Sequence, residues 1–235
     1  MSTRSLTLIV LLAAVAAGCA PAAAPTEPAP TEPPTAAPQP TEPPAAEPTA
    51  AEVAASPATF TFVAGETIAR FVVDEVLSGN PKTVVGETDA VTGAITLDWS
   101  APTQAALGPI EVDLSGLETD SGFRNRAIRE AILQSDKEEN RLATFTATEI
   151  SGLPESVTPG ASYELTITGD LTIKGTTRQV SFDAVVTPIS EDRIEGTASL
   201  AVPYADFGVD IPFLPPQVAS VEDIVSLEID LVAAR

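Results

Sequence analysis

Asp and Glu are the side chains of this sequence that could perform acid–base chemistry, and they outnumber Lys and Arg by 33 to 12 over 235 residues. Two carboxylates facing each other can act as general acid and base. The sequence has no histidine and a single cysteine, Cys19. This composition excludes Ser-His and Cys-His nucleophile pairs, histidine metal sites and intramolecular disulfides. Since the carboxylates mainly occupy alternating positions, as on a solvated strand face, we predict no catalytic residue, no metal site and no cofactor.

The basic side chains are gathered in one short stretch. Five of the eleven cations that follow Cys19 lie within residues 124–141, among them Arg124, Arg126 and Arg129. One interpretation is a solvated helix face paired with neighbouring carboxylates. The other is a rim that receives a phosphate-bearing headgroup, because the arginine fork fits phosphate oxygens. The formal charge of −21 predicts no nucleic-acid partner.

Cys19 directly follows an apolar stretch at the N-terminus. Leu6 to Ala17 is apolar except for Thr7; it is too short to cross a bilayer as a helix, which needs roughly 20 residues. It fits the apolar part of an export signal. The end of this stretch, Val15-Ala16-Ala17-Gly18-Cys19, resembles the lipobox of bacterial lipoproteins, although Ala16 stands where a bulky aliphatic is usual. We therefore expect a signal peptide over residues 1–18 and a lipidated Cys19 that anchors the exported protein to the outer side of a bacterial membrane.

The next segment, residues 19–57, is expected to be a disordered stalk. Residues 20–57 contain 12 of the 22 prolines, five glutamates and no Lys or Arg. Proline removes backbone donors and biases the preceding residue toward extended conformations, so neither helix nor sheet can propagate. A proline-rich peptide ligand is the alternative interpretation, but the basic residues that usually accompany such ligands are missing.

Residues 58–235 alternate between apolar and polar positions and form the predicted folded domain. Tyr163 to Ile173 places apolar residues and one glycine on one side and Thr, Asp and Glu on the other, and Val91 to Trp99 does much the same. Such a run is typical of a strand with one dry and one wet face. Many one-sided strands predict an all-β antiparallel barrel or sandwich. Further runs of this kind begin at Ile110, Val180, Ala198 and Val225.

One helix is expected among these strands. Thr119-Asp120-Ser121 supplies N-cap oxygens, and apolar residues then recur at helical spacing. These residues are Phe123, Ala127, Ile128, Ala131 and Ile132.

Several segments resemble the YceI family of extracytoplasmic polyisoprenoid- and lipid-binding proteins. The similarity begins at about Thr59 and continues to the C-terminus. The segments are Ile68–Val73, Gly93–Leu97, Arg124–Glu130, Ala143–Thr148 and, most specifically, Gly169–Val180 with its Gly-x-Leu-Thr-Ile-x-Gly-x-Thr pattern. Asn125, Arg141-Leu142 and Gln179 depart from the usual residues. The resemblance implies a lipocalin-like antiparallel β-barrel of about eight strands with one α-helix, holding an isoprenoid or fatty lipid inside.

We predict the residues that line that interior from their positions on the apolar faces of the strands. The alternative for each of them is ordinary packing in the hydrophobic core, which is the more frequent role of such residues. The predicted lining is Phe71, Leu97, Phe145, Leu165, Ile167, Phe182, Leu200 and Leu227. Phe207, Phe213 and Leu214, in an irregular segment, are expected to form a mouth or lid, and Arg124, Arg126 and Arg129 are candidate headgroup contacts.

Three functions follow from these expectations. The preferred one is a membrane-anchored carrier or store of a polyisoprenoid or similar long-chain lipid. The alternatives are a ligand-free structural or adhesive module on a stalk, and an enzyme with paired carboxylates. No feature of the sequence specifies an oligomeric state.

Overall fold

The alternating segments of the sequence form strands of one antiparallel sheet. The computed structural model describes residues 57–212 and 214–235. Its strands are β1 (Ala58–Phe62), β2 (Ile68–Leu77), β3 (Asn80–Thr88), β4 (Val91–Thr92), β5 (Ala94–Leu97), β6 (Ala106–Leu107), β7 (Ile110–Asp113), β8 (Leu142–Ser151), β9 (Tyr163–Ile173), β10 (Thr176–Ser190), β11 (Arg193–Pro203), β12 (Val218–Val221) and β13 (Ile224–Ala234).

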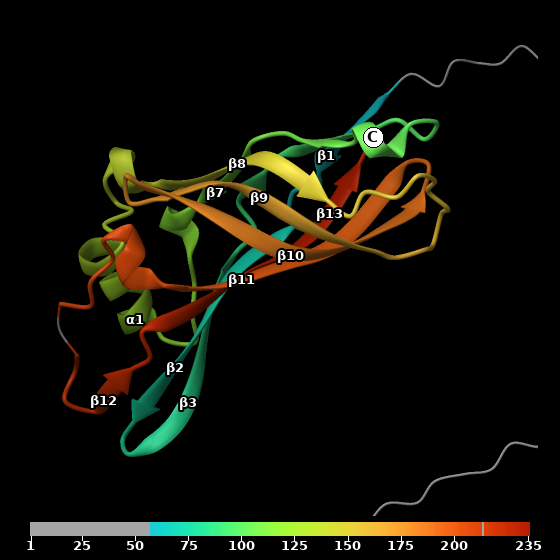
Figure 1. Ribbon diagram of the computed structural model, residues 1–235. Helices are drawn as coiled ribbons and strands as arrows, with labels where there is room; N and C mark the ends of the chain where they lie inside the picture. The colour runs from blue at the N-terminus through green and yellow to red at the C-terminus, as the bar shows by residue number, and fades with distance from the viewer. Residues whose placement is uncertain (1–56, 213) are drawn as a thin grey trace, which may run out of the picture. The chain divides into compact units, whose positions relative to one another are not determined.

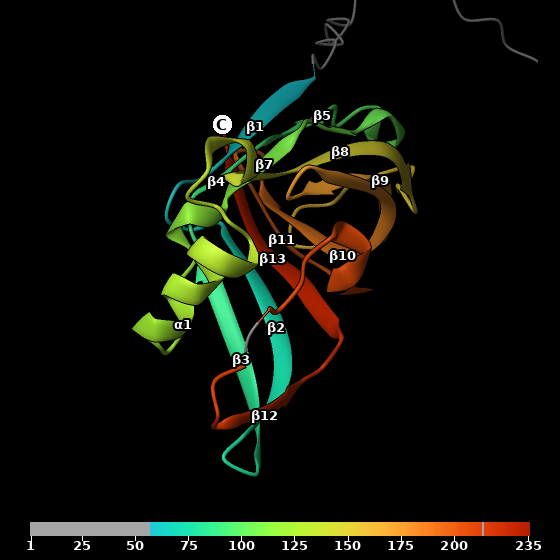
Figure 2. The same ribbon diagram turned by 90° about the vertical axis from the view of Figure 1, so that its left-hand side faces the viewer.

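The sheet curls so that its dry face is turned inward. From β7 to β11 each long strand pairs with the next one in the chain, and β11 pairs with β13. The other edge of β13 pairs with β1 and with β2, and β2 pairs with β3. The chain leaving β3 continues into β4, which pairs with β7. The result is the predicted all-β, barrel-like fold, a half-open barrel in which β8 to β10 face β2 and β13 across the interior (Figure 1, Figure 2).

Two glycines explain local features of the strands. The run Val91 to Trp99 is not one strand, because Gly93 separates β4, which pairs with β7, from β5, which pairs with β1. A Cβ at Gly93 would lie 2.5 Å from Cε2 of Phe62, so this position accepts no side chain unless the Phe62 ring moves. The turn between β9 and β10 consists of Lys174 and Gly175, both with positive φ, as a tight two-residue hairpin requires.

The helical part of the chain crosses one end of the sheet. Helix α1 (Gly122–Ala127) follows the N-cap residue Ser121, whose Oγ accepts a hydrogen bond from the Arg124 N–H at 3.4 Å. It continues as a π-helical segment, η3 (Ile128–Ile132). Phe123 does not follow the expected pattern: its side chain is 80 % exposed. It lies in the first turn of α1, which stands at the periphery beside β3 (Figure 2).

Short 3₁₀ turns complete the connections, and three apolar clusters form the core. None of the described helices is long and apolar enough to span a membrane. The turns are η1 (Pro102–Gln104), η2 (Leu114–Gly116), η4 (Glu138–Asn140) and η5 (Tyr204–Phe207). The clusters comprise Phe60, Leu97, Ile194 and Ala233; Leu114, Leu117, Ile128 and Ala143; and Phe145, Leu171, Phe207 and Val209.

Candidate functional site

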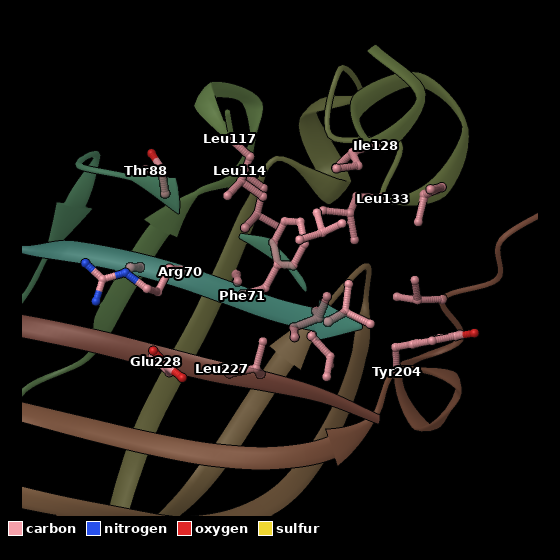
Figure 3. A pocket seen from close by; sticks show the side chains of 18 of the residues that line it. Arg70, Phe71, Thr88, Leu114, Leu117, Ile128, Leu133, Tyr204, Leu227 and Glu228 are labelled. Atoms are coloured by element: carbon pink, nitrogen blue, oxygen red, sulfur yellow. The ribbon is translucent and has the colours of Figure 1, made fainter. Parts of the chain in front are cut away.

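The curled sheet and the helix enclose a cavity of about 830 Å³. Strands β2, β3, β8, β9 and β13 contribute to its walls, and α1 with η3 covers one side. Ligand sites in proteins usually measure about 300–1,000 Å³. We call this space the main cavity; Figure 3 shows side chains that border it.

The main cavity is apolar because the inward positions of its strands carry apolar side chains. Phe71 on β2 is directly opposite Leu227 on β13, and both point into the space, where Leu133 approaches from the helical side (Figure 3). Phe145 on β8 and Phe182 on β10 meet edge to face, with ring centroids 5.2 Å apart. An interior of this kind favours an apolar occupant.

A small set of charged groups lies at one part of the cavity wall. Glu75, on the inward side of β2, is 5 % exposed and accepts a hydrogen bond from Nη2 of Arg124 at 2.7 Å. Arg124 also pairs with Asp120, which in turn pairs with Lys82 on β3. All four residues border the main cavity. Two cations and two carboxylates cancel in charge, so this group is a closed ion-pair network rather than a patch of one sign.

The three arginines predicted as headgroup contacts lie in different surroundings. Arg124 borders the main cavity but is held by Glu75 and Asp120. Arg126 is 72 % exposed and pairs with Glu130 one turn further along. Neither Arg126 nor Arg129 is among the residues that border the cavity, so the structure does not bring the three side chains together around it.

The eight predicted lining residues separate into four groups. Phe71, Phe145, Phe182 and Leu227 border the main cavity. Leu97 and Leu165 border a second, smaller cavity, and Ile167 borders both. Leu200 borders neither and packs against the cluster formed by Phe145, Leu171, Phe207 and Val209.

The segment expected to form a mouth or lid contributes directly to the main cavity. Phe207 and Leu214 both border it. Phe207, in η5, is only 2 % exposed and belongs to a core cluster, so it is a fixed part of the wall. Phe213 lies outside the described residues, as do Cys19, the expected signal peptide over residues 1–18 and nearly all of the expected stalk over residues 19–57.

Sequence reasoning missed several residues on the cavity wall. Leu114 belongs to the alternating run that begins at Ile110 but is not among the predicted lining residues. Leu117 follows η2, outside any alternating run, and Leu133 follows the end of η3. Ile128 belongs to the predicted apolar face of the helix, and it also borders the cavity. The sequence does contain a signal for Glu75. Phe71, Val73 and Glu75 alternate along β2 and therefore point to the same, inward face, where a carboxylate is unexpected among apolar side chains.

Ion pairs lower the pKa values of two carboxylates, and burial raises the pKa of one tyrosine. The pKa of Asp113 is lowered from 3.8 to about 2, chiefly by its hydrogen bond from Arg141. Hydrogen bonding from Lys82 lowers the pKa of Asp120, and burial raises the pKa of Tyr204. Within the described residues no three His, Cys, Asp or Glu side chains form a group that could hold a metal ion.

The smaller cavity lies beyond the main one, along the same strands. Its volume is about 120 Å³, and only apolar atoms form its surface. Residues of the connection between β8 and β9 border it, among them Leu153 and Val157. The interior as a whole is mainly apolar, which suits binding of a long apolar molecule. Apart from the four residues of the ion-pair network, the charged residues that border the main cavity are Arg70 and Glu228 (Figure 3).

Comparison with known proteins agrees with this geometry. A model of the YceI-like domain family matches residues 53–233. No curated protein matches the chain. Among solved structures, the chain is similar to a polyisoprenoid binding domain from Saccharophagus degradans implicated in plant cell wall breakdown, with a TM-score of 0.56 and 14 % identity over 74 % of this chain and 97 % of that one.

Two further solved structures show the same fold. BcnA from Burkholderia cenocepacia has a TM-score of 0.54 and 18 % identity, over 74 % of this chain and 99 % of that chain. The Campylobacter jejuni YCEI protein has a TM-score of 0.51 and 15 % identity, over 64 % of this chain and 84 % of that chain.

Proposed function

We propose, from the premise that the chain belongs to the family of YceI-like domains, that its barrel binds a polyisoprenoid or a similar long-chain lipid and serves as a carrier or store. The observation that carries this proposal is the apolar main cavity of about 830 Å³. A similar solved structure is described as a polyisoprenoid binding domain, which supports the same class of ligand.

The hydrophobic effect provides enough free energy for such binding. Each methylene group moved from water into an apolar space contributes about 0.8 kcal/mol. A long prenyl chain therefore needs few polar contacts to remain bound. The proposed role is binding rather than catalysis, and no cofactor enters it.

The proposed place of action is the outer side of a bacterial membrane. The apolar stretch that ends at Cys19 supports export and lipidation, and the proline-rich segment that follows would act as a tether. An intact mass of the mature protein tests this part. The expected result is an acylated N-terminal cysteine, whereas an unmodified or differently cleaved N-terminus would contradict it.

Extraction of lipid from the purified full-length protein tests the binding function. Mass spectrometry of the extract is expected to identify an isoprenoid or long-chain lipid in roughly equimolar amount. Val73→Trp would fill part of the cavity, since Val73 borders it. Val72→Trp is the matched control, because Val72 is the preceding residue of β2 and lies on the opposite face.

Loss of bound lipid in Val73→Trp but not in Val72→Trp would support the proposal. Protein that carries no lipid, and that fails to take up added prenols, would overturn it. Such a protein, with no bound lipid and no uptake of prenols, would instead favour the alternative of a structural or adhesive module.

A further inference from the structure

The two cavities are separated by one layer of side chains. Five residues border both of them, and we call these five the waist. They come from five different strands of the sheet, and four of them are branched aliphatics. The waist consists of Leu107, Ile110, Ile167, Ala198 and Ile229.

Strand pairing shows that the waist is a cross-section of the barrel. Ala198 on β11 is directly opposite Ile229 on β13. Ile167 on β9 is opposite Phe182 on β10, which borders the main cavity, and the next inward residue of β9, Leu165, borders only the smaller one. One step along β9 thus crosses from one cavity to the other.

The smaller cavity offers additional apolar space of a definite size. Its surface has no polar atoms, so a hydrocarbon chain would meet no desolvation cost there. If each carbon group takes about 30 Å³, the share of one molecule in liquid water, the 120 Å³ corresponds to roughly four carbons. By the same measure the main cavity holds roughly 28 carbons in its 830 Å³.

We propose that the waist sets the length of hydrocarbon chain that the barrel buries, with Ile167 as the main determinant of that length. This inference rests on the proposed lipid-binding function. The apolar end of the ligand stops at the waist, and any longer chain remains outside the main cavity. Without the Ile167 side chain the end of the ligand continues into the smaller cavity.

Binding of a ladder of linear prenols, from three to nine isoprene units, tests the waist. Affinity for the wild-type protein is expected to rise with length and then level off at about five to six units, by the volume estimate above. In Ile167→Ala the levelling point is expected to move up by about one unit. Each additional buried methylene raises affinity roughly fourfold, which follows from about 0.8 kcal/mol per group.

Two matched variants on the same strand control for loss of a buried side chain. Ile173→Ala removes an inward residue that borders only the main cavity, and Leu165→Ala removes one that borders only the smaller cavity. Both leave the waist intact, so neither is expected to move the levelling point by a full unit. Ile110→Ala serves as a second waist variant if Ile167→Ala does not fold.

The outcomes separate the waist from the function on which it depends. If affinity levelled off at the same prenol length in wild type and in both waist variants, the proposal that the waist sets the buried chain length would be wrong, even though prenols bind. The same upward shift in Leu165→Ala would also overturn it, because the smaller cavity would then be reached past an intact waist. Absence of binding at every length would instead contradict the proposed function.

Discussion

At the scale of single residues, Arg124 shows how a side chain predicted for a ligand has a structural role. Its guanidinium group links helix α1 to β2 through an ion pair with Glu75, and the Glu75 side chain is only 5 % exposed. A buried carboxylate is tolerated because a cation compensates it. The sequence identified the arginine but could not identify its partner, which lies 49 positions earlier in the chain.

Arg124→Ala is expected to lower the free energy of unfolding by about 3 kcal/mol. That value is the lower end of the range for breaking a buried pair, since the Arg124 side chain is 20 % exposed. Arg126→Ala removes an exposed pair within the helical segment and is expected to cost less than about 0.5 kcal/mol. Urea unfolding followed by Trp99 fluorescence measures both, and equal losses would argue against the structural role of Arg124.

Asp113 provides a pH-dependent contribution to stability. Its pKa of about 2 in the folded protein lies below the unfolded value of 3.8, so the folded state favours the charged carboxylate. The stabilisation is fully present above pH 3.8 and is lost as the pH falls toward 2. Asp113→Asn is therefore expected to cost about 2 kcal/mol at pH 7 and almost nothing at pH 2.

Unfolding measured from pH 7 to pH 2 checks this expectation. Glu111→Gln is the control, because it removes an exposed carboxylate from the same strand without removing an ion pair to Arg141. If the difference between wild type and Asp113→Asn remained constant down to pH 2, the pair with Arg141 would not be its source.

At the scale of elements, glycines on one strand make room for phenylalanines on the next. A Cβ at Gly86 would lie 2.2 Å from Cε1 of Phe71, its direct partner across β2 and β3. A Cβ at Gly169 would lie 2.4 Å from the backbone oxygen of Thr146 and 2.6 Å from the Phe145 ring. The obstacle is a movable ring in the first case and fixed backbone in the second.

The two glycines are therefore expected to respond differently to alanine. Gly86→Ala should displace the Phe71 ring into the main cavity, weakening prenol binding roughly tenfold at a stability cost of about 1–3 kcal/mol. Gly169→Ala should mainly lower stability, by more than Gly86→Ala does. Paired measurements of prenol affinity and urea unfolding distinguish the effects, and unchanged affinity in Gly86→Ala would contradict the expected movement of Phe71.

Regular alternation predicts strands and their inward faces, but it does not predict where a strand is interrupted. The strand expected at Tyr163 to Ile173 is β9, with the same ends. The run at Val91 to Trp99 instead changes partners at Gly93, where the Phe62 ring covers the backbone. Strand parity is a local property, whereas the packing of the Phe62 ring on Gly93 involves another strand, β1.

At the scale of the whole protein, the alternation of outward and inward strand positions accounts for both the acidic surface and the apolar interior. Outward strand positions carry mainly Thr, Asp and Glu, and the inward positions surround the cavity, so most charged side chains of the strands lie on the wet face. They contribute to a formal charge of −21 for the whole chain. Such a charge favours solubility but carries no information about the fold. What binds inside is therefore governed by the interior rather than by the charged surface.

The amino-acid pattern alone is enough to predict the all-β class, the helix, the parity of the main strands and the resemblance to the YceI family. Each of these follows from neighbouring residues, because side chains on a strand alternate with period two. The three-dimensional packing is needed to show which inward residues border empty space and which fill it, as Phe71 and Leu200 illustrate. It also decided that Arg124 is paired and that two cavities meet at a waist. The physical reason is that unfilled volume depends on how side chains from many strands pack together, and no single stretch of sequence contains that information.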